Sequence, residues 1–278
     1  MGGGSWATAI AKIVMHHEDK ITWYMRRDDR IEDFKRLHHN PAYLTGLHFD
    51  VDRIHFSSDI NEVVRENDTL IFVVPSPYIK GHLKRLKANM REKMVVTAIK
   101  GIVPDEGITV SRYFQRMFNV PEEQVACIGG PSHAEEVSRG IPTTIVVGAK
   151  KRKTAEYLQN IFISDVFRVY TSPDVLGMEL GGALKNVVAL AAGMADGLGY
   201  GDNTKAALIT RGIAEIERLG IKMGCRMETF NGLSGIGDLI VTCASMHSRN
   251  RRAGILMGEG RSYEEAMREV GQTVEGVY

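Results

Sequence analysis

The sequence predicts an α/β protein in which a doubly wound, mostly parallel sheet is followed by an all-α domain. Two observations carry the prediction. Up to about residue 170, short and nearly continuous apolar runs alternate with helix-like stretches, as in parallel sheets whose strands are buried on both faces. Beyond residue 172 the strand-like runs nearly stop, and helix-like stretches broken by glycine turns follow one another. We therefore expect two domains, residues 1–172 and residues 173–278.

Each predicted strand is rich in apolar or β-branched residues and is bounded by turn residues. In chain order the predicted strands are ITWYMRR (21–27), TLIFVVPS (69–76), KMVVTAIKG (93–101), QVACIGG (124–130), TTIVVGA (143–149) and FRVYTS (167–172). Residues 5–15 are predicted to form the helix that precedes the first of them.

Composition and charge exclude several classes of protein. A formal net charge of +1 argues against nucleic acid or an anionic membrane as the main partner. The three cysteines contain no C-x-x-C pair, so we expect neither a disulfide framework nor a zinc site. This cysteine usage indicates a reducing compartment. The most apolar run, LGGALKNVVALAAGMADGLG, contains a lysine and an aspartate and is a poor membrane span. A cytoplasmic protein without membrane insertion is expected.

The chain opens with a glycine-rich turn, in which Gly2, Gly4 and Ala7 fit the dinucleotide fingerprint G-x-G-x-x-G/A. The first glycine permits a tight turn, the second lets the backbone approach a pyrophosphate, and the following helix directs its N-terminus at the anion. The motif alone is weak, because a glycine-rich start left by cloning would look the same. A helix follows directly, however, and a predicted strand ends about 20 residues later, as the fingerprint requires.

The fingerprint normally follows a central strand, and no strand precedes Met1 in this sequence. Without that strand, its two neighbours would lack ladder partners. We therefore expect that the native chain begins upstream and that Met1 is an internal residue at the end of the first strand.

The charges after the second strand of such a sheet bear on cofactor choice. Arg26 and Arg27 stand where an NAD-specific protein usually has an acidic residue, and Asp28 and Asp29 follow them. Arginine can bind the 2′-phosphate of NADP, so NADP is favoured while NAD remains open. A solvated charge cluster is the alternative interpretation.

Lys185 is the most informative single residue. Its neighbours three and four positions away on the predicted helix are Gly181, Gly182, Val188 and Ala189, which form a small apolar face. Desolvation disfavours an ammonium ion, so a lysine on such a face can donate or accept a proton. The alternative is a lysine whose stem covers the edge of a core while its amine reaches solvent.

The chain resembles bacterial NAD(P)-dependent glycerol-3-phosphate dehydrogenases over essentially its whole length. The opening GGGSWATAIA is similar to the family's GAGSWGTALA, and NPAYLTG to its NPKYLPG. The other matching motifs follow in the family's order: IKG (99–101), GGPSHAEEV (129–137), GGALKNVVALAAGMADGLGYGDNTKAALITRG (181–212), FNGLSGIGDLIVTC (230–243) and SRNRR (248–252). Three positions depart from the family pattern: Ala7 replaces glycine, His133 replaces phenylalanine and Asn231 replaces an apolar residue.

The resemblance implies reversible hydride transfer between NAD(P)H and dihydroxyacetone phosphate. The product would be sn-glycerol 3-phosphate for phospholipid synthesis, and the assembly a homodimer. The first domain would bind the dinucleotide in a Rossmann-like fold. The second would bind substrate and would continue beyond residue 278, because the family has further helices there.

The resemblance also implies catalytic roles. Lys185 matches the proton donor, and Lys100 a residue that contacts substrate and cofactor beside the nicotinamide. Lys100 ends a predicted strand at the carboxyl edge of the sheet, where ligands bind in such folds, although a surface ion pair would also suit it. Asp238 matches a substrate contact that orients Lys185, although its position also suits a helix N-cap.

Ser248, Arg249 and Asn250 lie where a helix is predicted to begin. A serine cap, free backbone N–H groups and an arginine together form an anion site, which suits the substrate phosphate. By resemblance Arg249 also approaches the cofactor. Arg251 and Arg252 are interpreted as surface charges.

The remaining expected contacts come from the resemblance. Gly130 and Ser132 match positions that touch substrate, and Ser132 with Glu135 also has the spacing of a capping box. The positions that match cofactor contacts are Gly2, Gly4, Ser5, Trp6, Ala134 and Glu275. Core packing would explain Trp6 equally well.

Two rival functions remain open from the sequence. One is another two-domain dehydrogenase, such as a β-hydroxyacid dehydrogenase or a ketopantoate reductase, but SRNRR favours a phosphorylated substrate. The other is a non-catalytic NADP-binding sensor, but every position that the chemistry requires is filled.

Overall fold

A computed structural model describes all residues, 1–278. The strands are β1 (Ile21–Tyr24), β2 (Ile54–Ser57), β3 (Thr69–Phe72), β4 (Met94–Thr97), β5 (Ile102–Val103), β6 (Ile108–Thr109), β7 (Val125–Gly129), β8 (Thr143–Ala149) and β9 (Phe167–Ser172). The helices of the first part are α1 (Ser5–His17), α2 (Asp28–Leu37), α3 (Ile60–Glu66), α4 (Ile79–Leu83), α5 (Val110–Phe118), α6 (Ala134–Ser138) and α7 (Arg152–Phe162). The later helices are α8 (Val175–Gly197), α9 (Asp202–Lys222), α10 (Met227–Phe230), α11 (Asp238–Ala244), α12 (Arg249–Gly258) and α13 (Tyr263–Val270).

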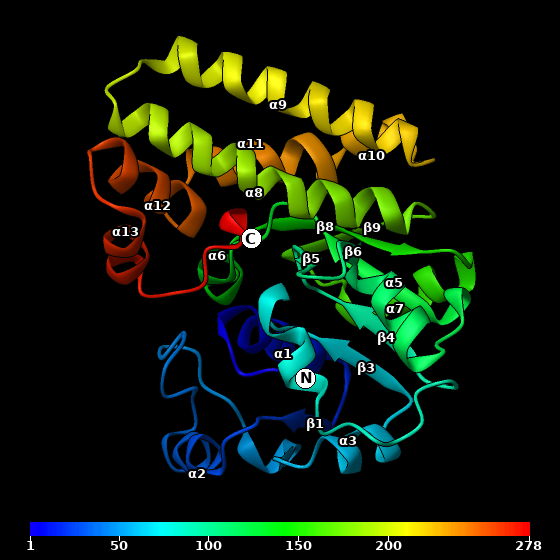
Figure 1. Ribbon diagram of the computed structural model, residues 1–278. Helices are drawn as coiled ribbons and strands as arrows, with labels where there is room; N and C mark the ends of the chain where they lie inside the picture. Colours follow the sequence, from blue (N-terminus) through cyan, green and yellow to red (C-terminus); the bar gives the residue numbers. More distant parts are fainter.

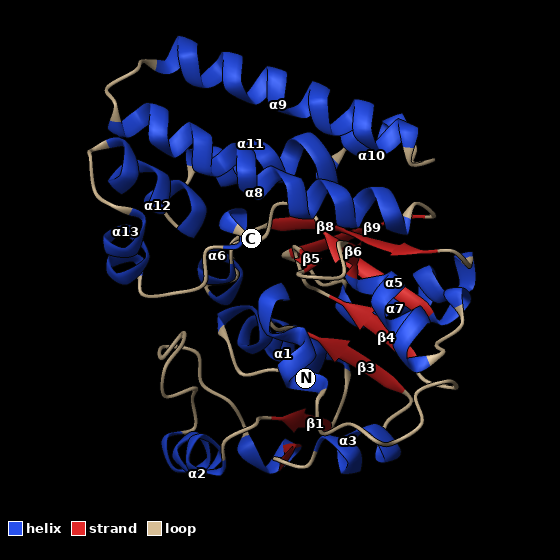
Figure 2. Cartoon of the chain, viewed as in Figure 1, coloured by secondary structure: helices blue, strands red, loops and turns tan.

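The main sheet has the strand order β3-β4-β7-β8-β9, and only the β7–β8 pair is antiparallel. Helices cover its faces, and a helical region that contains no strand follows β9 (Figures 1 and 2). The predicted fold class, a mostly parallel Rossmann-like sheet followed by helices, is confirmed.

The strands β1 and β2 form a separate parallel pair, and β1 does not pair with β3. The first two residues of the chain lie between the ends of β1 and β3. Gly2 N donates to Tyr24 O at the end of β1 at 3.2 Å, and Val73 N, just after β3, donates to Met1 O at 2.9 Å. A largely apolar cavity of about 290 Å³ lies between the two strands. The facing edges of β1 and β3 therefore have no ladder partner, as expected.

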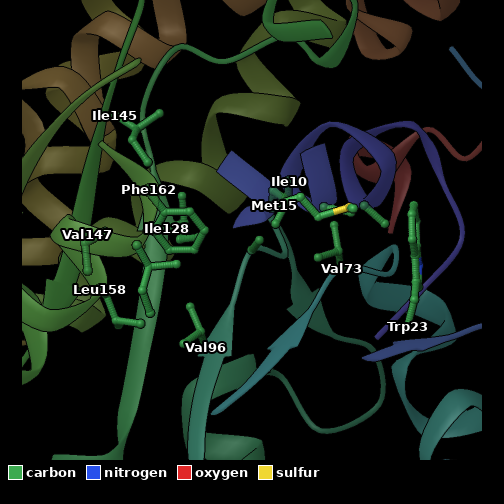
Figure 3. Close-up of a cluster of buried hydrophobic side chains, with 14 of the residues drawn as sticks. Ile10, Met15, Trp23, Val73, Val96, Ile128, Ile145, Val147, Leu158 and Phe162 are labelled. Carbon is green, nitrogen blue, oxygen red and sulfur yellow. The ribbon is translucent and has the colours of Figure 1, made fainter. Parts of the chain in front are cut away.

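The central strands are buried on both faces, which explains their continuous apolar sequences. Val95 and Val96 of β4 are both fully buried, but they belong to different hydrophobic clusters. Successive side chains of a strand point to opposite faces, so each face of the sheet needs apolar residues. Figure 3 shows part of the larger cluster, where Ile128 and Val147 meet Leu158 and Phe162 of α7.

In the helical region, α8 packs against α9, α11 and α12 (Figure 1). The contact with α12 is unusually close because glycines line it. A Cβ atom added at Gly193 of α8 would lie 2.2 Å from Arg251 O, and one added at Gly254 of α12 would lie 2.1 Å from Leu190 O. By length and hydropathy α8 is the one helix that could cross a membrane, but 56% of its apolar window is buried inside the protein.

Two features of the sheet region differ from the prediction. The strand β2 and the antiparallel β5–β6 pair were not predicted, and β3 and β4 end four residues before the predicted strands do. After these strands the chain leaves the ladder, and residues 73–75 and 98–100 line a cleft instead.

Candidate active site

The candidate site occupies a cavity of about 1380 Å³ at the carboxyl ends of β3, β4 and β7. This is the edge at which ligands bind in open α/β sheets. The first turn of α1 lies on one side of the cavity, and α8, α12 and the C-terminal residues lie on another. Its volume exceeds that of a typical site for one small ligand, so it has room for two.

Lys185 projects from α8 into this cavity but is only 4% exposed. Its Nζ atom donates to Asp238 Oδ1 at 2.5 Å and to Thr242 Oγ1 at 2.7 Å. The small residues Gly181 and Gly182 are buried beside it, as the sequence predicted for this face. The side chain is therefore fixed by α11 and does not reach bulk solvent.

Lys100 follows β4 and approaches the same carboxylate from the sheet. Its Nζ atom donates to Asp238 Oδ2 at 3.0 Å and to Gly130 O at 2.9 Å, and it lies 3.5 Å from Ser132 Oγ. Asp238 therefore stands between two ammonium groups, and the three side chains together carry one positive charge.

These charges shift the pKa values of both Lys185 and Asp238. Burial lowers the pKa of Lys185 to about 8; Asp238 opposes this shift and Lys100 adds to it. Burial alone would raise the pKa of Asp238, but Lys100 and Lys185 outweigh burial and lower it. At neutral pH the cluster thus contains a carboxylate and an ammonium ion that can lose its proton near physiological pH.

Asp238 is not an N-cap. A single π-helical turn, Leu233–Gly237, precedes α11, and Gly237 occupies the cap position. The helix starts at Asp238, whose side chain is taken by the two lysines. The capping interpretation is therefore wrong, whereas the expected contact with Lys185 is present.

Two polar residues that the sequence analysis did not single out complete the cluster. Thr242 lies one turn after Asp238 on α11, and its hydroxyl donates to Asp238 O at 2.5 Å while it accepts from Lys185. Asn186 donates to Lys100 O at 2.8 Å and accepts from Asn250 at 2.9 Å. Spacing was the available signal, because Asn186 adjoins Lys185 and Thr242 is one helical turn from Asp238.

The predicted anion site lies at the start of α12. Ser248 is the N-cap residue and its hydroxyl accepts from Arg251 N at 3.2 Å. Arg249 lines the cavity and has no hydrogen-bond partner within the chain. Asn250 is buried, and it accepts from Gly276 N at 2.8 Å as well as donating to Asn186.

The other two arginines of the SRNRR motif differ in their surroundings. Arg251 donates to Asp196 through Nε at 3.0 Å and Nη2 at 2.8 Å, with a side chain that is 14% exposed. The interpretation of Arg251 as a surface charge is therefore wrong. Arg252 lines the cavity, and its buried Nε atom has no partner.

The glycine turn has the shape that the fingerprint requires. Gly2 has φ +128°, and a Cβ atom there would lie 2.2 Å from Val73 O, so only glycine fits. No atom lies within 4 Å of a Cβ added at Gly4, which leaves open space above the turn. The first N–H groups of α1, at Ser5 and Trp6, have no intrahelical acceptor and no capping side chain.

This turn fits a dinucleotide, because unpaired N–H groups at a helix N-terminus bind a pyrophosphate. Trp6 also lines the cavity, and its buried Nε1 atom has no partner. Arg26 and Arg27 are both exposed at the same end of the cavity. Arg27 is paired with Asp29, whereas Arg26 has no hydrogen-bond partner.

The turn after β7 also differs from one expectation. Ser132 Oγ donates to Gly130 O at 3.0 Å, and α6 begins after His133 without any side-chain cap. The predicted capping box of Ser132 and Glu135 is therefore wrong. Ala134, the first residue of α6, is buried at the cavity wall.

Glu275 connects the C-terminal residues to the sheet. Its Oε1 atom accepts from Ser76 N at 2.9 Å. Burial raises the pKa of Glu275, against lowering effects of the Ser76 N–H and of the cations Arg249, Lys185 and Lys100. Two of the residues that depart from the family pattern lie in different places. His133 lines the cavity, whereas Asn231 is exposed and lies outside it.

Comparison with known proteins gives consistent results. The family model described as NAD-dependent glycerol-3-phosphate dehydrogenase N-terminus matches residues 1–155, and the one described as its C-terminus matches residues 174–278. Proteins named glycerol-3-phosphate dehydrogenase (NAD(P)+) are 50% identical in Agathobacter rectalis and 45% identical in Bacillus subtilis, covering 100% of this chain and 82% and 81% of theirs. The crystal structure of glycerol-3-phosphate dehydrogenase from Coxiella burnetii has 32% identity and a TM-score of 0.90, covering 100% of this chain and 84% of that one.

Proposed function

Since this chain belongs to the NAD-dependent glycerol-3-phosphate dehydrogenase family, we propose that the Lys185 amine moves the proton of the reaction. The protein is an oxidoreductase that reversibly interconverts dihydroxyacetone phosphate and sn-glycerol 3-phosphate with NAD(P)H. The product supplies phospholipid synthesis. Bound NADPH or NADH supplies the hydride for C2 of the ketone.

The observation that carries the proposal is the buried amine of Lys185, held by Asp238 at the wall of the cavity. An acid works best when its pKa lies near the operating pH, and the pKa of Lys185 is about 8. The ammonium donates a proton to the ketone oxygen during reduction, and the neutral amine accepts it during oxidation. Asp238 holds the side chain in place and balances its charge.

The substrate is positioned by groups on both sides of Lys185. The Lys100 ammonium contacts substrate and cofactor beside the carbonyl, and Ser132 forms the adjacent wall. Gly130, whose carbonyl accepts from Lys100, contacts the substrate next to it. The phosphate lies at the start of α12, where Arg249 has a free guanidinium and Ser248 and Asn250 fix the turn. Fixing both ends of a small ketone supplies the orientation that hydride transfer needs.

The cofactor lies along the sheet edge. Its pyrophosphate binds over Gly2 and Gly4, against the N–H groups of Ser5 and Trp6. NADP is the favoured dinucleotide, since Arg26 and Arg27 are cations at the position of the ribose phosphate. Ala134, Glu275, Lys100 and Arg249 contact the cofactor nearer its reactive end.

We assign residues 1–172 as the dinucleotide-binding domain and residues 173–278 as the substrate-binding domain. The enzyme acts in the cytoplasm, without membrane insertion, as a homodimer. The exposed apolar side chains Leu219, Ile221 and Met223 near the end of α9 support an interface between two copies.

The Lys185→Ala variant tests the proposed role. We expect turnover of dihydroxyacetone phosphate to fall by roughly 10³-fold or more, because the acid is lost, while NADPH affinity stays nearly constant. Steady-state kinetics and titration of NADPH fluorescence measure the two effects. Lys153→Ala, which removes an exposed lysine of α7 outside the cavity, is the control. Unchanged turnover in Lys185→Ala would overturn the proposal.

A further inference from the structure

We propose that Asn40 is a positioning residue for the cofactor, and that its side-chain amide holds the glycine turn in the conformation that binds the pyrophosphate. The inference rests on the proposed function, because it concerns the dinucleotide that the turn is proposed to bind. Asn40 opens the NPAYLTG motif, residues 40–46, and lies 37 positions along the chain from the turn residue Gly3.

The side-chain amide of Asn40 is 2% exposed and uses all of its hydrogen-bonding capacity within the chain. Its Nδ2 atom donates to Gly3 O at 3.1 Å and to Thr8 Oγ1 at 2.8 Å. Its Oδ1 atom accepts from Ala42 N at 3.0 Å and from Tyr43 N at 3.2 Å. An asparagine side chain has two N–H donors and two acceptor lone pairs, so all four are occupied. The amide therefore joins its own loop to the glycine turn.

The bond to Gly3 O holds the middle peptide unit of the turn. The carbonyl before it, Gly2 O, accepts from Trp23 Nε1 at 2.7 Å, and the carbonyl after it, Gly4 O, accepts the first hydrogen bond of α1. No backbone N–H donates to Gly3 O. Because glycine has wide backbone freedom, the peptide unit between Gly3 and Gly4 could rotate without the asparagine.

The direction of the Gly3 carbonyl sets the direction of an N–H group. In a planar trans peptide the C=O of one residue and the N–H of the next point in opposite directions. Since Gly3 O points to the buried amide, Gly4 N–H points away from it. Gly4 lines the cavity, its N–H has no partner in the chain, and no atom lies within 4 Å of a Cβ added there. Asn40 thus aims this donor, beside the N–H of Ser5, at the place of the pyrophosphate.

Holding the turn before the cofactor arrives increases its affinity. A glycine pair without an anchor samples several backbone conformations, and only a fraction of them would present the N–H groups together. The apparent dissociation constant increases as the fraction of the binding-competent conformation falls. Loss of Asn40 should therefore weaken the binding of ligands that contain a pyrophosphate, while the chemical step at Lys185 is unaffected.

The Asn40→Ala variant tests this role by separating KM from kcat. We expect the KM for NADPH to increase roughly tenfold, the value of one hydrogen bond. At saturating NADPH, kcat and the KM for dihydroxyacetone phosphate should stay within about twofold of the wild type. A merely structural role would instead reduce the folded fraction, which lowers the apparent kcat and leaves the KM for NADPH unchanged.

The Asn40→Ser variant separates the turn from the loop. A serine hydroxyl can accept from the N–H two residues on, as Asn40 does from Ala42, but it is too short to reach Gly3 O. Calorimetric titration with ADP, which contains a pyrophosphate, and with adenosine, which does not, measures the two parts. We expect the dissociation constant of ADP to increase roughly tenfold and that of adenosine to change within about twofold.

Asn61→Ala is the matched control. Asn61 also joins two backbone segments, because its Nδ2 atom donates to Arg85 O at 2.9 Å and its Oδ1 atom accepts from Lys87 N at 2.6 Å and Ala88 N at 2.9 Å. It lies outside the cavity. We expect this variant to unfold at lower denaturant concentration while the KM for NADPH and the dissociation constant of ADP stay unchanged.

Three results would overturn the inference. The first is an unchanged KM for NADPH in Asn40→Ala, and the second is an equal increase in Asn61→Ala. The third is an equal weakening of ADP and adenosine in Asn40→Ser, which would assign Asn40 to its loop alone. Failure of the wild type to reduce dihydroxyacetone phosphate would refute the proposed function itself, whereas the ADP titration needs no turnover and still tests Asn40.

Discussion

At the scale of single residues, the site depends on one carboxylate shared by two amines. Asp238 is 1% exposed and receives hydrogen bonds from both Lys100 and Lys185. Two buried ammonium ions without a counter-ion would repel each other and would lose a proton. The carboxylate therefore keeps Lys185 able to carry a proton in spite of its burial.

The Asp238→Asn variant tests this balance. We expect the pKa of Lys185 to fall below its present value of about 8, because burial and Lys100 then act without the opposing charge. The ammonium form becomes scarce at neutral pH, so turnover in the direction of ketone reduction should fall roughly 100-fold or more. A pH series of kcat measures both effects, since the remaining activity should decline at lower pH than in the wild type.

Asp196 provides a matched control within the same chain. It also lies between two cations, with Lys205 at 2.7 Å and Arg251 at 2.8 Å, but outside the cavity. Asp196→Asn is expected to lower the free energy of unfolding while leaving the pH dependence of turnover unchanged. If both variants altered the pH dependence equally, the special role of Asp238 would be contradicted.

A residue of the site could be predicted from the sequence where its neighbours along the chain were chemically unusual for its type. Lys185 on a small apolar helical face is such a case. Asn186 and Thr242 were missed because an asparagine and a threonine on a helix are common, and their contacts depend on how α8, α11 and the sheet meet. Arg251 was misread because its partner Asp196 lies on another helix, 55 residues away.

At the scale of elements, the approach of α8 to α12 places the amine and the anion site on adjacent helices. Glycines make this possible, since side chains at Gly193 or Gly254 would collide with the facing backbone. Lys185 and Arg249 consequently line one cavity from two helices. The glycines of the 181–212 motif thus have a packing role distinct from that of the turn at Gly2.

The Gly254→Ala variant tests this packing. The added methyl group meets Leu190 O at 2.1 Å, and a backbone atom cannot move aside as a side chain can. We expect the free energy of unfolding to fall by about 1–3 kcal/mol, as measured by denaturant titration. Gly81→Ala in α4 is the control: nothing lies within 4 Å of its added Cβ atom, so a gain of about 0.5–1 kcal/mol is expected. A neutral Gly254→Ala would show that the two helices can separate without cost.

Strands were predictable where they are buried on both faces, because their sequences are then continuously apolar. The strand β2, IHFS, escaped prediction since it is short and only two of its four residues are buried. The capping box failed for a different reason. Spacing alone cannot tell whether a serine hydroxyl bonds to its helix or to a carbonyl on the other side, and here Gly130 O takes it.

At the scale of the whole molecule, three hydrogen-bonded contacts join the helical region to the sheet region in addition to the Lys100–Asp238 pair. Glu179 of α8 accepts from Ser111 N at 2.9 Å, Asn186 donates to Lys100 O, and Glu275 accepts from Ser76 N. Two of the three lie directly beside the cavity. The site is thus formed only when both regions are in contact, and no short segment of sequence contains it.

The central claim is that Lys185 carries the proton, and the pH dependence of kcat/KM in both directions tests it most directly. Reduction needs the ammonium form, so its rate should be level below pH about 8 and decline above it. Oxidation needs the neutral amine, so its rate should increase with pH and become level above about 8. Limbs of opposite sign with a shared midpoint near 8 are the expected result. A midpoint absent from that range, or limbs of the same sign in both directions, would contradict the account.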